Sequence, residues 1–298
     1  PEFLRYHLLC RFPQVRKQRL FKTVRDEVRS SADVFALMDA LEQRADLFAA
    51  MDDTAHEFWQ ERPAARPHIR DLQLFGVRQH TPLVFAAWAR LSPDDFVRVL
   101  KLLCVVSFRY TVIGGLNTNE LEPVYHRAAK GVLDGELTTP AAVFNALRSI
   151  YVDDDKFVRD FSNKEMDTNG RRKKLVKYVL CHLEADASGV ARQWETDPGT
   201  IEHVLPENPS VSWDEAFSPE RQKDFVYRLG NFLLLESSIN RNCQNVEFAQ
   251  KVPLYAGSAY ALTKGLAESV VEWNPATLGE RQSRMAARAA HVWRADFA

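Results

Sequence analysis

Cysteine is scarce in this chain, and its four copies stand far apart. No two of them form a Cys-x-x-Cys pair; they are Cys10, Cys104, Cys181 and Cys243. This spacing argues against a zinc ribbon, which needs paired thiolates, and against a framework of disulfides. Scattered cysteines are typical of proteins in a reducing compartment, so we expect this protein to be cytoplasmic.

Long apolar runs and an excess of charge are also missing. The longest apolar run is LLCVVSF (102–108), far shorter than the roughly 20 residues that span a bilayer, and the first residues do not resemble a secretory signal. We therefore expect no contact with a membrane. The formal net charge is −1, so any binding to nucleic acid must come from local basic patches and not from an overall positive field.

A helical pattern runs through most of the first 187 residues. The segment SADVFALMDALEQRADLFAAM (31–51) is the strongest example, and SPDDFVRVLKLLCVVSFRYTV (92–112) opens with a first-turn proline followed by two acids. The segment NGRRKKLVKYVLCHLEA (169–185) continues the series, and no fixed-period repeat is visible. We predict an α-helical domain of seven or more helices over residues 1–187.

The character of the sequence changes near residue 187. The segment DASGVARQWETDPGT (186–200) is polar, with two glycines and a proline, and is typical of a joint between domains. After it we expect a short extended stretch through His203, an apolar strand in NFLLLE (231–236) and an asparagine-rich helix over 237–251. The sequence therefore predicts a mainly α protein, with a strand–strand–helix unit embedded in helices as a second domain over 188–298.

Four residues of this second domain have the chemistry that a metal-assisted phosphodiesterase needs. A neutral His203 can take a proton from water. Glu202 and the side-chain carbonyl of Asn240 are hard ligands suited to one Mg²⁺ or Mn²⁺ ion, and the amide of Asn231 can hold a facing histidine. Adjacent strand residues point to opposite faces, so Glu202 and His203 can share a site only at a twisted strand end. The two prolines of IEHVLPENP favour such an end.

The order histidine, asparagine, asparagine on a strand–strand–helix frame resembles the HNH, or ββα-metal, nucleases. The stretches IEHVLPENP, RLGNFLLL, INRNCQNVEFAQKVPLY and SAYALTKGLAESVVEWNPATLGERQSRMAARAAHVW resemble the C-terminal domain of the GmrSD-type restriction endonucleases. The stretches FLRYHLLCRF, VRKQRLFKTV and RRKKLVKYVLCHLE resemble the helical middle part of the same proteins. The likeness covers most of the chain and is strongest from 201 to 294.

This resemblance implies a bacterial anti-phage defence nuclease that acts on DNA. Its relatives often respond to DNA modification, and they include effectors that sense phosphorothioate DNA. By the same resemblance, His203 is the general base, Asn231 holds its ring, and Glu202 and Asn240 bind the cation. Many HNH nucleases have Asp where Glu202 stands, and the longer side chain changes the reach to a metal. One such site cuts one strand, so nicking is the simplest product.

The resemblance also implies a partner domain. Such proteins usually carry an N-terminal nucleotide-hydrolysing domain with an Asp-Gly-Gln-Gln-Arg motif. That motif is absent from this sequence, which begins with PEF and not with methionine. We therefore expect the chain to be the C-terminal part of a longer protein whose N-terminal part is an NTPase or sensor domain.

Clusters of cations are the candidate contacts to DNA phosphates. Two single residues near the motif, Arg241 and Lys251, could add positive charge for the phosphate. Cations at a helix start oppose the helix dipole, so phosphate contact and a solvated helix start are equal alternatives for Arg171, Arg172, Lys173 and Lys174. The last helix places a basic stripe at three- and four-residue steps, which either faces solvent or lines a DNA groove: Arg281, Arg284, Arg288 and His291.

Each motif residue also has a structural interpretation. A lone histidine between apolar residues is usually structural, Asn231 after Gly230 suits a turn, and Asn240 suits a helix cap. The catalytic hypothesis therefore depends on the four residues together. Two other functions stay open: a DNA-binding or protein-docking module with an inactive nuclease motif, and a ribonuclease toxin on the same frame.

Overall fold

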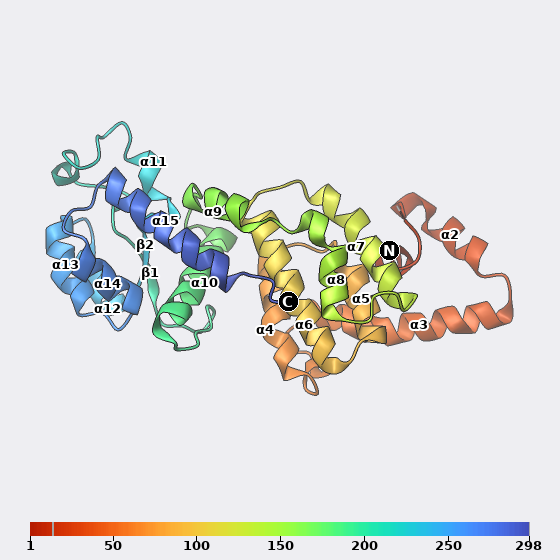
Figure 1. Cartoon of the computed structure of the whole chain (residues 1–298). Helices are drawn as coiled ribbons and strands as arrows, with labels where there is room; N and C mark the ends of the chain where they lie inside the picture. The colour runs from red at the N-terminus through yellow and green to blue at the C-terminus, as the bar shows by residue number, and fades with distance from the viewer. Residues whose placement is uncertain (14, 298) are drawn as a thin grey trace. The chain divides into compact units, whose positions relative to one another are not determined.

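The structure, a computed structural model, describes residues 1–13 and 15–297. Within these residues the chain is built from α-helices and one two-stranded sheet, as Figure 1 shows. The prediction of a mainly α protein with a small strand–strand element is confirmed. The chain divides into two compact units, one of Pro1–Val152 with the last residues from Ala295, and one of Asp153–Arg294.

The first unit is entirely helical in its described part. Its helices are α1 (Glu2–Leu9), α2 (Leu20–Glu27), α3 (Ser31–Ala50), α4 (Arg66–Phe75), α5 (Thr81–Arg90), α6 (Pro93–Ser107), α7 (Leu121–Leu133) and α8 (Pro140–Ala146). Helix α3 begins with a capping box, in which the side chains of Ser30 and Asp33 each accept a backbone N–H of the other. Helices α5, α6 and α7 form the core, where Phe85, Leu103 and Tyr125 are fully buried.

The second unit wraps helices around the sheet. Its elements are α9 (Asp154–Ser162), α10 (Gly170–Ser188), β1 (Thr200–His203), α11 (Lys223–Val226), β2 (Phe232–Leu235), α12 (Ser237–Cys243), α13 (Phe248–Ala256), α14 (Ala261–Ser269) and α15 (Pro275–Val292). The two strands are antiparallel, with Glu202 opposite Leu233 and His203 opposite Phe232. Helices α10 and α14 both pack on β2. All four residues of β2 are buried, which explains why this strand is a continuous apolar run.

The second unit begins earlier than the predicted joint at 186–200. Helices α9 and α10, which the sequence analysis assigned to the helical domain, pack inside the second unit. The side chain of Gln282 on α15 donates to the backbone oxygens of Phe161 and Lys164, and Trp293 donates to the hydroxyl of Tyr178 on α10. A helical pattern alone does not show which core a helix joins, so the sequence placed the change at the first loss of helical pattern.

The predicted asparagine-rich helix over 237–251 is two helices instead of one. Helix α12 ends at Cys243, and α13 begins at Phe248. Between them Gln244 has a φ of 32°, a left-handed value that ends the α-helix. Polar turn-forming residues in NRNCQN permit this break without destroying the apolar spacing on either side.

Gly230 allows α15 to approach the start of β2. A Cβ atom at this position would lie 2.8 Å from the backbone oxygen of Leu278 and 2.8 Å from the Cβ of Gln282, both on α15. The side-chain oxygen of Gln282 also accepts the backbone N–H of Gly230 at 3.1 Å. A close approach between this residue and the last helix of the unit therefore requires glycine here.

Replacing this glycine should destabilise the second unit. We expect Gly230→Ala to lower the free energy of unfolding by about 1–3 kcal/mol, because the added methyl group forces helix and strand apart. Urea unfolding followed by tryptophan fluorescence measures the change. Gly279→Ala is the matched control, since a Cβ at Gly279 meets nothing within 4 Å. Equal unfolding midpoints for wild type and Gly230→Ala would show that α15 does not pack this closely.

None of the described helices combines the length and the apolarity that crossing a membrane requires.

Candidate functional site

His203 is the last residue of β1, and its ring lies between an aromatic side and a polar side. The ring edge packs on Phe232, with centroids 4.9 Å apart and planes at 86°. On the polar side, Nε2 lies 3.4 Å from a carboxylate oxygen of Glu207 and 3.5 Å from the hydroxyl of Thr168. The side chain is 15% exposed. The imidazole is therefore held at the surface of the unit, and a small part of it stays accessible to solvent.

The chain before α10 is brought to His203 by pairing with the residues before β2. Glu165 forms an isolated antiparallel bridge with Arg228, and the N–H of Met166 donates to the backbone oxygen of Tyr227 at 2.9 Å. The hydroxyl of Thr168, two residues before α10, then donates to Glu207 at 3.0 Å. This pairing puts the start of α10 beside the histidine, although the two are more than thirty residues apart in sequence.

The ring of His203 is neutral at ordinary pH. Burial lowers the pKa of His203 to about 4; the carboxylate of Glu207 opposes this shift, while the charges of Lys251 and Lys173 add to it. A neutral imidazole can accept a proton, as a general base must. The contribution of Lys173 shows that the cationic start of α10 acts electrostatically on the ring.

The low pKa of His203 makes the stability of the second unit depend on pH. Its folded pKa of about 4 lies below its unfolded value of about 6.5. Between these values the unfolded chain binds a proton that the folded chain does not, so stability is lost as the pH falls from 6.5 towards 4. We expect His203→Gln to weaken this pH dependence, measured as the free energy of unfolding against pH. An unchanged slope in the variant would mean that His203 titrates normally.

Glu202 lies in a buried ion pair on the other side of β1. It is 5% exposed, and its Oε1 accepts from the ammonium of Lys251 at 2.8 Å and from the hydroxyl of Tyr255 at 2.8 Å. Burial raises the pKa of Glu202, and the ion pair with Lys251 opposes the rise. As adjacent residues of β1, Glu202 and His203 point to opposite faces, and their side chains contact different residues. The predicted metal ligand is thus engaged with protein donors and faces away from the imidazole.

Lys251 holds the backbone at the end of β1. Besides Glu202, its ammonium donates to the backbone oxygens of His203 at 3.0 Å and Val204 at 3.1 Å. The side chain is 0% exposed, and all three of its donors have acceptors. The prediction that Lys251 contacts DNA phosphates does not fit this placement, because the cation is covered by protein. Its role is to fix the chain that carries the histidine.

Asn231 also acts on the backbone and not on the ring. Its Oδ1 accepts from the N–H of Leu205 at 2.8 Å and from Trp273 Nε1 at 3.2 Å, and its Nδ2 donates to the oxygens of Leu205 and Val226. These four contacts use the whole hydrogen-bonding capacity of the amide. The prediction that Asn231 holds the imidazole is therefore replaced by an indirect role, in which it anchors the chain two residues beyond His203.

Asn240 joins α12 to β1. Its Nδ2 donates to the hydroxyl of Thr200 at 2.8 Å and to the backbone oxygen of Ile201 at 3.2 Å. Thr200 and Glu202 share one face of the strand, and His203 is on the other. The structure therefore places Asn240 on the side of Glu202, and does not bring it to the imidazole.

The predicted basic patch at the start of α10 is exposed next to the histidine. All four side chains face solvent: Arg171, Arg172, Lys173 and Lys174. Asn169, which precedes the helix, makes no side-chain cap, so the first N–H groups of α10 are not capped by that residue. Arg172 pairs with Asp167, while Arg241 is exposed on α12, with its Nε 3.3 Å from the backbone oxygen of Ser237. Exposed cations and a helix N-terminus together favour a phosphate.

Three residues near His203 were missed by the sequence analysis: Thr168, Glu207 and Tyr227. Glu207 follows the histidine by four residues within IEHVLPENP, so a turn after β1 could have suggested it. Tyr227 hydrogen-bonds to Glu207, and burial together with that acid raises the pKa of Tyr227. No sequence signal points to Thr168, because only the bridge between Glu165 and Arg228 brings it there.

The side chains around β1 also determine whether a divalent cation can bind there. Within the described residues, no group of three or more His, Cys, Asp or Glu side chains is arranged to hold a metal ion. The predicted pair of Glu202 and Asn240 does not fit one, since the carboxylate is bound to Lys251 and Tyr255. Glu207 is the carboxylate beside His203, and its side chain is 44% exposed.

A neutral imidazole, an exposed carboxylate and a cationic helix start are the groups that hydrolysis of a phosphodiester uses. Residues 151–288 match the family model for the C-terminal domain of the GmrSD restriction endonucleases. The resemblance drawn from the sequence is thus confirmed over this segment, and the match supports a nuclease module of the restriction-endonuclease type. Comparison with curated proteins gave no match.

The matched segment begins two residues before the second unit and ends within α15. It therefore includes α9 and α10, so that RRKKLVKYVLCHLE belongs to the matched C-terminal domain and not to a separate middle part. The likeness of the first 150 residues to a helical middle part stays a prediction.

Proposed function

We propose that the second unit is a nuclease module that hydrolyses phosphodiester bonds of DNA, with His203 as its general base. The observation that carries the proposal is the position of this neutral imidazole, which lies beside the exposed cationic start of α10 inside the segment that matches a restriction-endonuclease domain. Both the base and the phosphate contact that hydrolysis needs are then present on one surface.

In this proposal His203 takes the proton of the water that attacks phosphorus. Glu207, 3.4 Å from Nε2, stabilises the imidazolium that forms. A pKa near 4 makes a weak base at neutral pH, and a bound phosphate corrects this, since its negative charge favours the protonated ring and raises the pKa of His203. The site is therefore a better base when DNA occupies it.

The start of α10 supplies the phosphate contact in the proposal. Its four exposed cations and its N–H groups attract the phosphate from the side on which Thr168 meets His203. Lys251 and Asn231 act through the backbone. Lys251 binds the backbone oxygens of His203 and Val204, and Asn231 binds both backbone groups of Leu205. The base is thus fixed through its backbone and its Phe232 contact.

The Mg²⁺ or Mn²⁺ ion expected from the sequence remains part of the proposal. Glu207 is the residue that would hold it, together with water and a phosphate oxygen, because Mg²⁺ commonly binds through only one or two carboxylates. When bound there, the ion would neutralise charge on the phosphate. One histidine site per chain supports nicking as the simplest product, and recognition of modified DNA, the cytoplasmic location and the N-terminal partner domain also remain expectations.

The basic patch can be tested through the salt dependence of DNA binding. We expect the double variant Lys173→Gln/Lys174→Gln to bind duplex DNA more weakly and to lower the slope of log K against log salt by about 1.8, or about 0.9 for each lost phosphate contact. Fluorescence anisotropy at several salt concentrations measures the slope. The control Lys101→Gln/Lys264→Gln removes two exposed lysines from other helices. If both double variants show the slope of wild type, α10 is only a solvated helix.

A further inference from the structure

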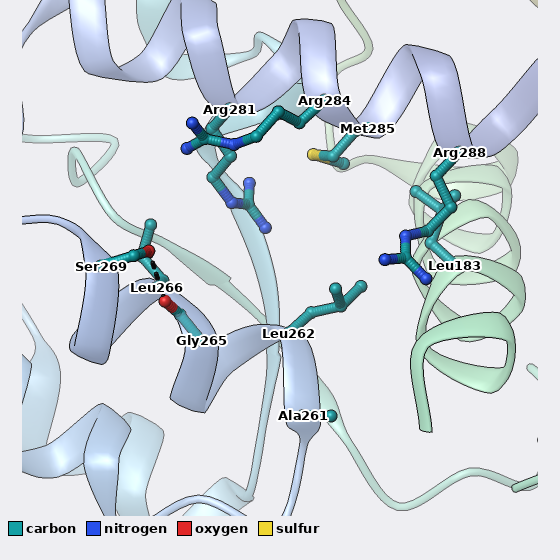
Figure 2. A pocket seen from close by; sticks show the side chains of 10 residues that line it. All are labelled: Leu183, Ala261, Leu262, Gly265, Leu266, Ser269, Arg281, Arg284, Met285 and Arg288. Carbon is teal, nitrogen blue, oxygen red and sulfur yellow. Dashed lines mark hydrogen bonds between the residues drawn. The ribbon is translucent and has the colours of Figure 1, made fainter. Parts of the chain in front are cut away.

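Residues of helices α10, α14 and α15 line a pocket of about 220 Å³ in the second unit that is open to solvent on one side, shown in Figure 2. One wall is apolar and consists of Leu183, Leu262, Leu266 and Met285. The other side is formed by the arginine side chains of α15, which extend over the pocket in Figure 2: Arg281, Arg284 and Arg288. None of the described residues that line the pocket is acidic, so its surface combines positive charge with apolar area.

Arg281 is the unusual member of this set because its charge is buried. It is 7% exposed, and its Nη1 donates to the backbone oxygen of Gly230. Burial lowers the pKa of Arg281 to about 10, with Tyr255 opposing the shift and the like charge of Arg284 adding to it. Across the described chain no carboxylate forms an ion pair with Arg281. A buried cation without a countercharge costs free energy, which an anion in the pocket would recover.

The other two arginines of the pocket, Arg284 and Arg288, differ in how strongly a carboxylate pairs with them. Arg284 is exposed, and its Nη1 is 3.9 Å from a carboxylate oxygen of Glu280, which is a weak ion pair. Arg288 is paired with Asp186 at 2.7 Å. Glu184, next to Leu183, is bound by the N–H groups of Ala261 and Leu262 and does not line the pocket. An incoming anion therefore meets two guanidinium groups that no strong carboxylate partner occupies.

We propose that this pocket binds a phosphate monoester that carries a flat organic group, the chemical class of the nucleoside monophosphates. Guanidinium groups pair with phosphate oxygens through two parallel hydrogen bonds, and the leucine and methionine wall covers the organic group. A volume of about 220 Å³ lies below the roughly 300–1,000 Å³ of pockets for drug-sized ligands, so it accommodates one nucleotide unit at most. The source is either a free nucleotide or the phosphorylated end of a DNA strand.

The pocket is distinct from the surface around His203, and its lining includes none of the residues that contact the imidazole. The proposal therefore goes beyond the nuclease function and does not depend on it. Gly265 makes a direct test possible, because it lines the pocket and a Cβ added to it meets nothing within 4 Å. A leucine at this position fills the pocket and also suits the helix interior.

The binding test uses the full chain and calorimetry with 2′-deoxyadenosine 5′-monophosphate, inorganic phosphate and deoxyadenosine. We expect the nucleotide to bind more tightly than phosphate, and deoxyadenosine not to bind. Gly265→Leu and Arg284→Gln should each weaken binding of the nucleotide by about tenfold or more. The leucine fills the space of the ligand, and the glutamine removes a charged hydrogen bond, which is worth about that factor. Gly279→Leu on α15 and Lys264→Gln on α14 are the matched controls, outside the lining, and should bind as wild type.

A short DNA strand with and without a 5′-phosphate distinguishes the two sources. The pocket is assigned to a strand end if binding of the DNA strand needs its 5′-phosphate and is lost in Gly265→Leu, while the free nucleotide does not bind. Binding of the free nucleotide that Gly265→Leu removes assigns it to a nucleotide. The proposal fails if neither probe binds, or if Gly265→Leu and Arg284→Gln bind as wild type does. Gly265→Leu should nick supercoiled plasmid at the wild-type rate, which separates the pocket from the nuclease function.

Discussion

His203→Ala is expected to nick supercoiled plasmid about a thousandfold more slowly than wild type in Mg²⁺ or Mn²⁺. Removal of a general base typically costs about 10²–10⁴ in rate. Glu207 and Thr168 both contact the ring at Nε2, and they stay hydrogen-bonded to each other when the imidazole is removed. Conversion of supercoiled to open-circular plasmid, with and without EDTA, measures the rate.

The controls for this result separate chemistry from folding. The ring of His203 is 15% exposed and packs on Phe232, so urea unfolding of the variant is measured as well, and nicking is compared at temperatures where both proteins are folded. His291→Ala removes an exposed histidine from α15 and should nick normally. Wild type and His203→Ala that are equally inert, yet both shift DNA in a gel, would identify an inactive DNA-binding or docking module. Preferential degradation of RNA would identify a ribonuclease on the same frame.

Lys251→Met is expected to lower the free energy of unfolding of the second unit by about 3–5 kcal/mol. The methionine retains the length of the side chain but removes its charge, which leaves the carboxylate of Glu202 buried without its cation. The backbone oxygens of His203 and Val204 lose their donor as well. Urea unfolding measures the loss, and nicking should also fall at temperatures where the variant is folded, because the chain beside the base is released.

A double-mutant cycle tests whether Lys251 acts through Glu202. The combination Glu202→Gln/Lys251→Met should lose less stability than the two single changes added together, by about 0.5–3 kcal/mol, because the pair no longer contains an unmatched charge. Lys264→Met removes an exposed lysine and should leave stability nearly unchanged. A Lys251→Met protein as stable as wild type would show that the lysine is not buried in this ion pair.

The sequence predicted the elements of the second unit better than their packing. The strands around His203 and in NFLLLE, and the long final helix, follow directly from apolar spacing and proline positions. The start of the unit at Asp153 could not be found in this way, because α10 has the same helical pattern whichever core it joins. The break at Gln244 depends on one left-handed residue, which a periodic pattern does not reveal.

The candidate site was only partly predictable for a similar reason. The importance of IEHVLPENP and the basic start of α10 came from residue type and order. The partners of each side chain did not, because they depend on which face of β1 a residue occupies: Glu202 faces Lys251 and Tyr255, whereas His203 faces Thr168 and Glu207. The alternation of side chains along the strand was expected from the sequence, but the residues that cover each face were not visible there.

The most direct measurement is the Cε1–H resonance of His203, assigned by its loss in His203→Gln, during titration of the full chain with a short DNA duplex in EDTA. We expect this resonance to shift as DNA binds, the pKa of His203 to rise from about 4 in the complex, and Lys173→Gln/Lys174→Gln to weaken the response. Saturating DNA binding with the resonance and its pKa unchanged would place the DNA elsewhere and contradict the role of His203 as the base.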